Sequence, residues 1–163
     1  MDDRVLEQLK RTPLLADIRD NVEYLARIAG ICSLQSVAAG EVVIHEGERG
    51  AQMYIMVAGS VEIQRNTRAG DVYTVVKLRA EDNVFFGEMA LIDDDVRSAT
   101  IVTTADSEFL VLSKADFLAL GDDYPQIALP ITREIARILA GRLRKTTGDM
   151  LTIFDALVSE LQQ

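Results

Sequence analysis

Residues 86–98 contain a glycine, a carboxylate and a guanidinium whose types and spacing suit a phosphorylated sugar: Gly87, Glu88 and Arg97. Glycine lets the backbone approach a ligand closely, and a guanidinium binds anionic oxygens through two parallel hydrogen bonds. A carboxylate accepts hydrogen bonds from sugar hydroxyl groups. Apolar, strand-like sequence flanks the segment on both sides and predicts walls that exclude water. These residues therefore predict a pocket for a small anionic ligand.

Arg97 is the leading candidate for binding the anion. It precedes small and apolar residues at 99–103, so its guanidinium is expected at the edge of a dry pocket. A charge there is costly unless it is paired, and the planar guanidinium fits a phosphate. The spacing alone also allows a structural ion pair with Glu88 or with an aspartate at 93–95. On the same grounds, Glu88 is also compatible with an exposed surface acid, and Ser98 with a solvent-facing strand residue.

The composition predicts one domain with a packed core, because the chain has 163 residues of which 48% are apolar. Its 17 Lys and Arg residues against 26 Asp and Glu residues give a formal charge of −9, which argues against nucleic acid as a partner. No apolar run approaches the about 18 residues of a membrane-spanning helix, and no signal peptide is visible. We therefore expect a cytoplasmic protein that does not associate with membranes.

The sequence offers little for catalysis or metal binding. His45 is the only histidine and Cys32 the only cysteine, so neither a cluster of metal ligands nor an internal disulfide is expected. The sequence also lacks a recognisable catalytic triad or phosphate-transfer loop. We expect no metal site, no cofactor and no enzymatic activity.

Three zones must position the candidate residues. Residues 1–36 are predicted to form N-terminal helices, because apolar residues recur there at spacings of three and four. Residues 37–113 contain short β-rich runs between Gly, Asn and Asp residues, which is typical of a double-sheet roll or small barrel. Residues 114–163 are predicted to be helical, with a short helix that ends at Gly121 and a long one that begins at Pro125. The predicted strand runs are 42–44, 53–57, 61–63, 72–78, 98–103 and 109–112.

Apolar residues of the long C-terminal helix form a heptad-like stripe that Thr146 and Gly148 weaken. Its members are Ala136, Leu139, Leu143, Thr146, Met150, Ile153 and Leu157. The stripe either packs on the protein's own roll or pairs with a second copy in a homodimer. The sequence leaves both alternatives open.

The strand region before residue 86 has glycines and an aromatic-aliphatic pair at characteristic places. They fall at Gly40, Glu46-Gly47, Tyr54-Ile55 and Gly59. Together with residues 86–100, this pattern closely resembles the cyclic nucleotide-binding domain family, of the catabolite-activator type, over residues 40–112 and the flanking helices. The resemblance implies a mainly β fold with flanking helices, namely a double-stranded β-helix (a jelly-roll-like β-roll) with N-terminal helices and a long C-terminal helix. It also implies that residues 1–163 form a single, stand-alone cyclic nucleotide-binding domain.

The resemblance also implies which residues contact a ligand. Those for phosphate and ribose are Gly87, Glu88, Met89, Ala90, Arg97 and Ser98. Those for the base and a lid over it are Val84, Phe85, Ala99, Arg142, Leu143 and Thr146. In the family the glutamate accepts the ribose 2′-hydroxyl, and a helical turn, here residues 89–91, turns its amides toward the phosphate. Binding would tighten the phosphate-binding cassette, which is residues 87–97, and would move the C-terminal helix about a hinge at 109–116.

The implied ligand is 3′,5′-cyclic AMP, which bacterial members of the family mostly use, while the hydroxyl of Ser98 keeps cyclic GMP open. Three features depart from the family pattern. Val96 stands where proline is frequent, residues 79–84 lack the usual Gly-Asp pair, and the aspartates at 93–95 adjoin the anion site. The simplest expectation for these aspartates is a solvated turn that points away from the ligand. The implied partners are a cyclic mononucleotide, a second copy through the C-terminal helix, and a downstream protein of unknown identity.

Two alternative functions remain open from the sequence. One is a degenerate, ligand-free roll that serves as a dimerisation or interaction module. The other is the effector domain of a truncated transcription regulator, but only 18 residues follow Lys145, too few for a helix-turn-helix domain. We therefore expect a stand-alone nucleotide-binding protein.

Overall fold

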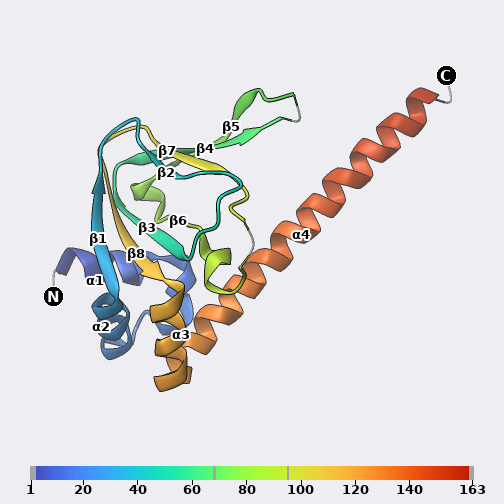
Figure 1. Ribbon diagram of the computed structural model, residues 1–163. Helices are drawn as coiled ribbons and strands as arrows, with labels where there is room; N and C mark the ends of the chain where they lie inside the picture. The colour runs from blue at the N-terminus through green and yellow to red at the C-terminus, as the bar shows by residue number, and fades with distance from the viewer. Residues whose placement is uncertain (1–2, 68, 95, 162–163) are drawn as a thin grey trace.

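The computed structural model describes residues 3–67, 69–94 and 96–161 of the chain. The N-terminal helical segments are α1 (Asp3–Arg11), the 3-10 helix η1 (Pro13–Ile18) and α2 (Val22–Ile31). Two helices follow the strands, α3 (Lys114–Asp123) and α4 (Pro125–Leu161), and the second is 37 residues long. These helices gather at one end of the strands, and α4 runs from there past the side of the roll (Figure 1).

The strands form two four-stranded antiparallel sheets in the described chain, with the orders β1-β8-β3-β6 and β2-β7-β4-β5. Their bounds are β1 (Cys32–Val37), β2 (Val42–Ile44), β3 (Gln52–Ala58), β4 (Ser60–Asn66), β5 (Val72–Arg79), β6 (Phe85–Phe86), β7 (Thr100–Thr103) and β8 (Ser107–Ser113). Within the roll, Tyr54 stacks on Phe86 at 5.4 Å between ring centroids, and Phe109 meets both rings edge to face. The predicted mainly β fold with flanking helices is confirmed.

An apolar cluster separate from these aromatic rings packs the helices against the roll. Buried side chains of β3 and β8 share this cluster with buried side chains of α4, namely Met53, Ile55, Leu110 and Leu112 with Ile127, Ile131 and Ile135. Burial of each such side chain contributes roughly 1.5–3 kcal/mol to the folded state. The start of α4 is therefore fixed to the sheet that carries β6, and β6 leads directly into the candidate residues 87–97.

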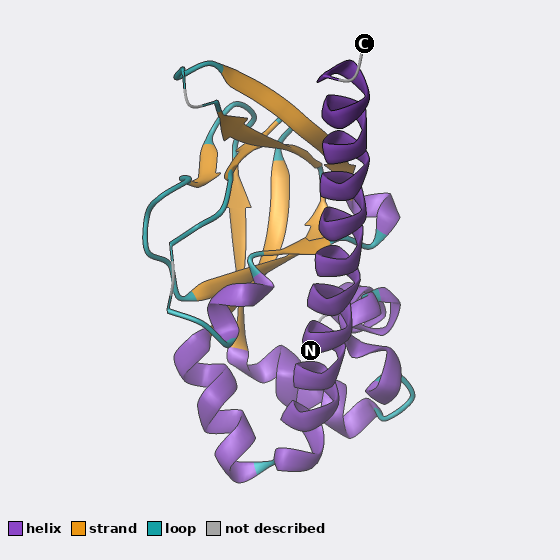
Figure 2. Cartoon of the chain, turned by 90° about the vertical axis from the view of Figure 1, so that its right-hand side faces the viewer, coloured by secondary structure: helices purple, strands orange, loops and turns teal. Residues whose placement is uncertain are grey.

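The second half of α4 leaves the roll. Leu143, Met150 and Phe154 have 68%, 66% and 63% of their surface exposed. Figure 1 shows this part of the helix standing clear of the strands, and in Figure 2, which is turned by 90°, α4 passes in front of the roll. Packing on the protein's own roll therefore accounts for the beginning of α4 but not for the predicted stripe from Leu143 onward. No helix in the described part of the chain is long and apolar enough to cross a membrane.

The structure corrects two predicted boundaries. Residues 32–36, assigned to the N-terminal helices, belong to β1, which pairs along its whole length with β8 from Cys32 opposite Leu112 to Val37 opposite Ser107. Tertiary pairing thus overrides the local pattern. Helix α3 also continues through Gly121 to Asp123. A Cβ at Gly121 would lie 3.3 Å from the Cβ of Ala128, so this glycine serves the close approach of α3 to α4 rather than a helix end.

Two further differences concern short elements. The strand predicted over 98–103 begins only at Thr100, and Ser98 and Ala99 precede it. Strand β6 was not predicted, because two residues are too few for a period-two pattern to be visible.

Candidate functional site

A cavity of about 670 Å³ lies between the β-roll, the 3-10 helix η3 (Glu88–Leu91) and α4. Most residues predicted to contact a ligand border it: Val84, Phe85, Gly87, Glu88, Met89, Ala90, Arg97, Ser98, Ala99 and Arg142. Leu143 and Thr146, predicted for the lid, are not among its lining residues, and both are exposed. The structure thus brings together the predicted residues of the roll and one of the three predicted on α4.

Gly87 makes the sharp backbone turn at the start of the cassette. Its φ is 76°, a left-handed conformation that glycine adopts at little cost, and η3 begins at the next residue. A Cβ at this position would lie 2.8 Å from Nη1 of Arg97 and 3.1 Å from the carbonyl oxygen of Gln52. Gly87 is therefore required both by the backbone turn and by the side chain packed against it. The helical turn predicted at 89–91 is present as η3.

Arg97 is held by backbone carbonyl groups. Its Nη2 donates to the carbonyl oxygen of Gln52 at 2.6 Å and its Nη1 to that of Gly87 at 3.3 Å. Among the residues that the structure describes, no carboxylate lies within ion-pair distance of its guanidinium, so the alternative of a structural ion pair is not realised there. Partial burial lowers the pKa of Arg97, and Tyr54 and Glu88 partly offset this effect. The site thus presents a partly desolvated, oriented cation with donors left for an anion.

Gly50 is a supporting residue that the sequence did not single out. A Cβ there would overlap Nε of Arg97 and lie 2.7 Å from its Cζ, so any other residue at this position would force the guanidinium to move. The sequence shows Gly50 only as one of several glycines near strand ends. Its contact with Arg97 joins two segments far apart in the chain, and no local pattern signals such a contact.

Glu88 is buried, with 2% of its surface exposed, which rules out the surface-acid alternative. Its Oε1 accepts a short hydrogen bond of 2.5 Å from Nη1 of Arg142 on α4. Arg142 itself keeps 57% of its side chain exposed. The resemblance placed Arg142 over the base, whereas the structure joins it to the carboxylate expected at the ribose. Helix α4 is therefore connected to the cassette by an ion pair.

The two described aspartates after η3 are both exposed, and one of them also borders the cavity. Asp93 borders the cavity, whereas the Asp94 side chain is 88% exposed and pairs with Nζ of Lys114 at 2.6 Å. A hydrogen bond from Lys114, with its positive charge, lowers the pKa of Asp94. Both residues agree with the predicted solvated turn, but Asp93 also borders the cavity and so does not point wholly away from it. Asp95, the third member of the run, lies outside the described residues.

The segment between β5 and β6 lacks the usual Gly-Asp pair and turns at Asn83 instead. Asn83 follows the 3-10 helix η2 (Ala80–Asp82) with a φ of 53°, the left-handed conformation that asparagine tolerates better than most residues. Its N–H donates to the carbonyl oxygen of Ala80 at 3.0 Å. Asp82 and Asn83 both border the cavity, and neither was predicted as a site residue.

The remaining lining is mainly apolar and was not predicted in detail. Its apolar residues include Ile44, Ile63, Val76, Leu78, Phe86, Ile101 and Ile138. Period-two alternation within the strands signals such inward side chains, but the cavity that they share appears only in the fold. No group of three or more His, Cys, Asp or Glu residues that could hold a metal occurs within the described ranges. The arrangement can enclose a planar apolar ring beside a cation and a buried carboxylate.

Comparison with known proteins gives a consistent result. The family model for the cyclic nucleotide-binding domain matches residues 34–124. The chain is 34% identical over 106 residues to the cyclic AMP receptor protein of Thermus thermophilus. This alignment covers 65% of this chain and 46% of that protein. It is 30% identical over 117 residues to human cGMP-dependent protein kinase 2, covering 71% of this chain and 15% of the kinase.

A solved structure shares the fold. The crystal structure of the Thermus thermophilus catabolite activator protein matches with a TM-score of 0.75 and 27% identity, over 85% of this chain and 62% of that one. The chain thus spans less than two thirds of the length of each of these proteins.

Proposed function

Because this chain belongs to the cyclic nucleotide-binding domain family, we propose that it is a regulatory sensor that binds a 3′,5′-cyclic mononucleotide in the cavity beside Arg97. The observation that carries the proposal is the environment of Arg97, a partly desolvated cation held in place by two carbonyl groups. A cyclic phosphate would complete its coordination through charge-assisted hydrogen bonds of roughly 1.5–3 kcal/mol each.

Glu88 would bind the ribose. Its carboxylate is buried within the same cassette, and only its Oε1 accepts from Arg142. A carboxylate oxygen has more than one lone pair, so the side chain can accept from Arg142 and from the 2′-hydroxyl together. The backbone at Gly87, Met89 and Ala90, with Ser98 beside Arg97, would surround the phosphate and ribose. Val84, Phe85 and Ala99 would line the path toward the base.

Cyclic AMP is the ligand that we favour over cyclic GMP. The relative with the higher identity, 34%, is named as a receptor of cyclic AMP, and the other, at 30%, as a kinase dependent on cyclic GMP. Ser98 supplies a hydroxyl at the cavity, which suits the amino group of guanine and keeps cyclic GMP as the alternative. We propose a regulatory rather than a catalytic role, with the downstream partner undefined.

The signal would leave the site through α4. Glu88 would receive the ribose hydroxyl while bound to Arg142, so ligand binding and the position of α4 affect the same carboxylate. A ligand shifts such an equilibrium only by its different affinity for the two arrangements. The predicted hinge at 109–116 spans the end of β8 and the start of α3, where the chain turns from sheet to helix.

A homodimer through α4 is also part of the proposal. The apolar side chains that α4 leaves more than half exposed are Leu143, Met150, Leu151, Ile153, Phe154 and Leu157. At roughly 100 Å² each, a symmetric pair would bury about 1,200 Å², the lower limit of a specific interface. These exposed side chains also support the second candidate function, a dimerisation module that binds no nucleotide.

Calorimetric titration with cyclic AMP, cyclic GMP and 5′-AMP tests the proposal, using protein freed of bound nucleotide. We expect saturable binding of one cyclic nucleotide and weak binding of 5′-AMP. Arg97→Ala is expected to abolish binding while circular dichroism stays unchanged. Unchanged affinity in that variant, or no binding by the native protein, would refute the nucleotide sensor; the second result would favour the dimerisation module.

A further inference from the structure

The phosphate subsite lies beside a loop that carries negative charge. The loop residues Asp93 and Asp94 follow Ile92, the C-cap of η3, and Asp93 borders the cavity. The whole chain has a formal charge of −9, so the anionic ligand proposed above approaches an acidic protein. Unpaired carboxylates near a cyclic phosphate would oppose its binding through Coulomb repulsion.

Lys114 contacts this loop at two points. Its Nζ lies 2.6 Å from Oδ1 of Asp94 and donates to the carbonyl oxygen of Asp93 at 3.3 Å. The lysine side chain is only 19% exposed although it carries a charge. One cation thus binds the backbone of one loop residue and the carboxylate of the next.

The position of Lys114 is fixed independently of the loop. It is the first residue of α3, and its N–H donates to the carbonyl oxygen of Ala51 at 2.7 Å. Ser113 caps the same helix by accepting from the N–H of Asp116 at 3.0 Å. The loop therefore rests on a defined point of the scaffold, whereas the Asp94 side chain is largely in solvent.

We propose that Lys114 is a positioning residue of the phosphate subsite that acts by charge: it holds the Asp94 carboxylate of the loop at α3 and neutralises it, so that the approach to Arg97 stays open to an anion. This inference rests on the proposed function. Lys114 does not line the cavity, so it acts through the loop and not by contact with the ligand. Arg49 adds a weaker attraction on Asp94 and does not replace the two contacts of Lys114.

A positioning role by charge is separable from a structural role. Ion pairs with an exposed partner contribute little to stability, so removing this one should hardly change unfolding. Its electrostatic effect on a bound anion must weaken as salt increases, because the Debye length falls from about 30 Å at 0.01 M to about 8 Å at 0.15 M. A loss of affinity caused by altered packing would not depend on salt in this way.

The test compares cyclic nucleotide affinity of the native chain with Lys114→Met and with Lys10→Met as matched control. Lys10→Met removes the same charge from an exposed ion pair on α1, in which Nζ of Lys10 lies 2.7 Å from Oε1 of Glu7. At low salt we expect a loss of about three- to tenfold for Lys114→Met, little change for Lys10→Met, and a smaller loss for Lys114→Met at high salt. Lys114→Met combined with Asp94→Asn should recover most of the affinity.

Each other outcome overturns the inference. Equal affinities for Lys114→Met and the native chain show that the lysine has no role in binding. A loss that is independent of salt, or that Asp94→Asn does not restore, shows a structural role instead. If the native chain binds neither cyclic nucleotide, the proposed function fails first and this inference fails with it, so the two failures are distinguished by the native titration.

Discussion

The ion pair between Glu88 and Arg142 gives the sharpest prediction, because the proposed ligand and α4 use the same carboxylate. In Glu88→Gln a charged acceptor of the ribose 2′-hydroxyl becomes a neutral one. Hydrogen bonds to charged groups contribute roughly 1.5–3 kcal/mol and neutral ones about 0.5–1.5 kcal/mol. The variant should therefore lose about tenfold of its preference for cyclic AMP over the 2′-deoxy analogue, since 1.4 kcal/mol corresponds to a factor of ten.

Arg142→Ala removes the other partner of Glu88 and leaves a buried carboxylate without its cation. Breaking a fully buried pair costs about 3–5 kcal/mol, but Arg142 keeps 57% of its side chain exposed, which reduces the cost. We expect about 1–2 kcal/mol lower unfolding free energy for the protein without nucleotide, measured in urea. Arg133→Ala, an exposed arginine on the same helix, is the control and should change stability by less than about 0.5 kcal/mol.

Titration of both variants with cyclic AMP and its 2′-deoxy analogue completes the assay. Equal losses for the two ligands in Glu88→Gln would refute the assignment of Glu88 to the ribose. Equal unfolding free energies for Arg142→Ala and Arg133→Ala would show that the ion pair does not connect α4 to the cassette in solution.

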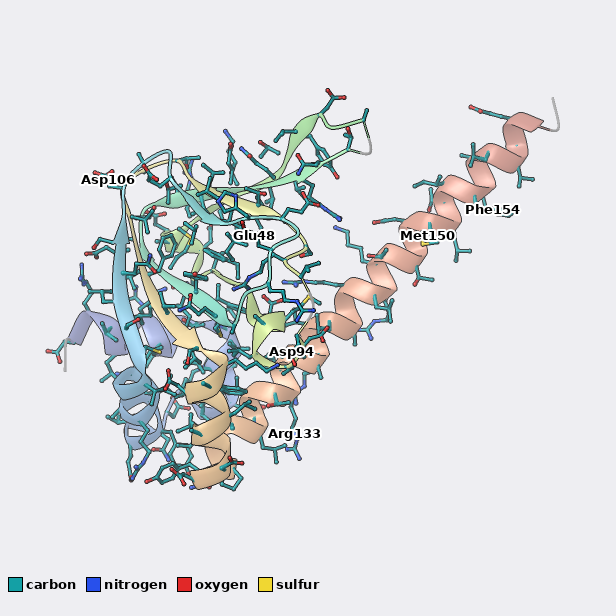
Figure 3. The ribbon with its side chains drawn as sticks, in the orientation of Figure 1. Glu48, Asp94, Asp106, Arg133, Met150 and Phe154 are labelled. Atoms are coloured by element: carbon teal, nitrogen blue, oxygen red, sulfur yellow. The ribbon has the colours of Figure 1, made fainter. Side chains whose placement is uncertain are left out.

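Two further predictions concern the support of Arg97 and the free half of α4. Gly50→Ala should lower cyclic nucleotide affinity more than tenfold in calorimetry, because its Cβ would displace the Arg97 guanidinium, whereas Gly30→Ala, where a Cβ meets nothing within 4 Å, should bind normally. Native affinity in Gly50→Ala would contradict the close packing. Phe154→Glu should convert the proposed dimer to a monomer in light scattering, because it places a charge among the exposed apolar side chains of α4 (Figure 3). An unchanged mass would exclude these side chains as the interface.

The local sequence was sufficient for the fold class and for the ends of the cassette. Gly87 and Arg97 lie ten positions apart, and both belong to one recognisable segment. Alternating apolar residues and regularly placed glycines predicted most of the strands. These features depend on neighbours in the chain, and this is why they are visible without coordinates.

Contacts between distant segments were not predictable. The bond from Arg142 to Glu88 spans 54 positions and that from Lys114 to Asp94 spans 20. Leu143 follows Arg142 directly but faces away from the cavity, because successive helical residues are separated by about 100°. The heptad pattern predicted the apolar stripe but not the point at which α4 leaves the roll. That point depends on how far along α4 the packed apolar cluster extends.

The length of α4 gives the ion pair a mechanical consequence. From Arg142 to Leu161 the helix runs about 28 Å at 1.5 Å per residue. If α4 turns about Ile135, the last fully buried residue of its packed start, a rise of 1.5 Å per residue places Arg142 about 10 Å and Leu161 about 39 Å from that pivot. A shift of about 1 Å at Arg142, where α4 contacts Glu88, would then move the far end by roughly 4 Å, so under the proposed function the helix would act as a lever.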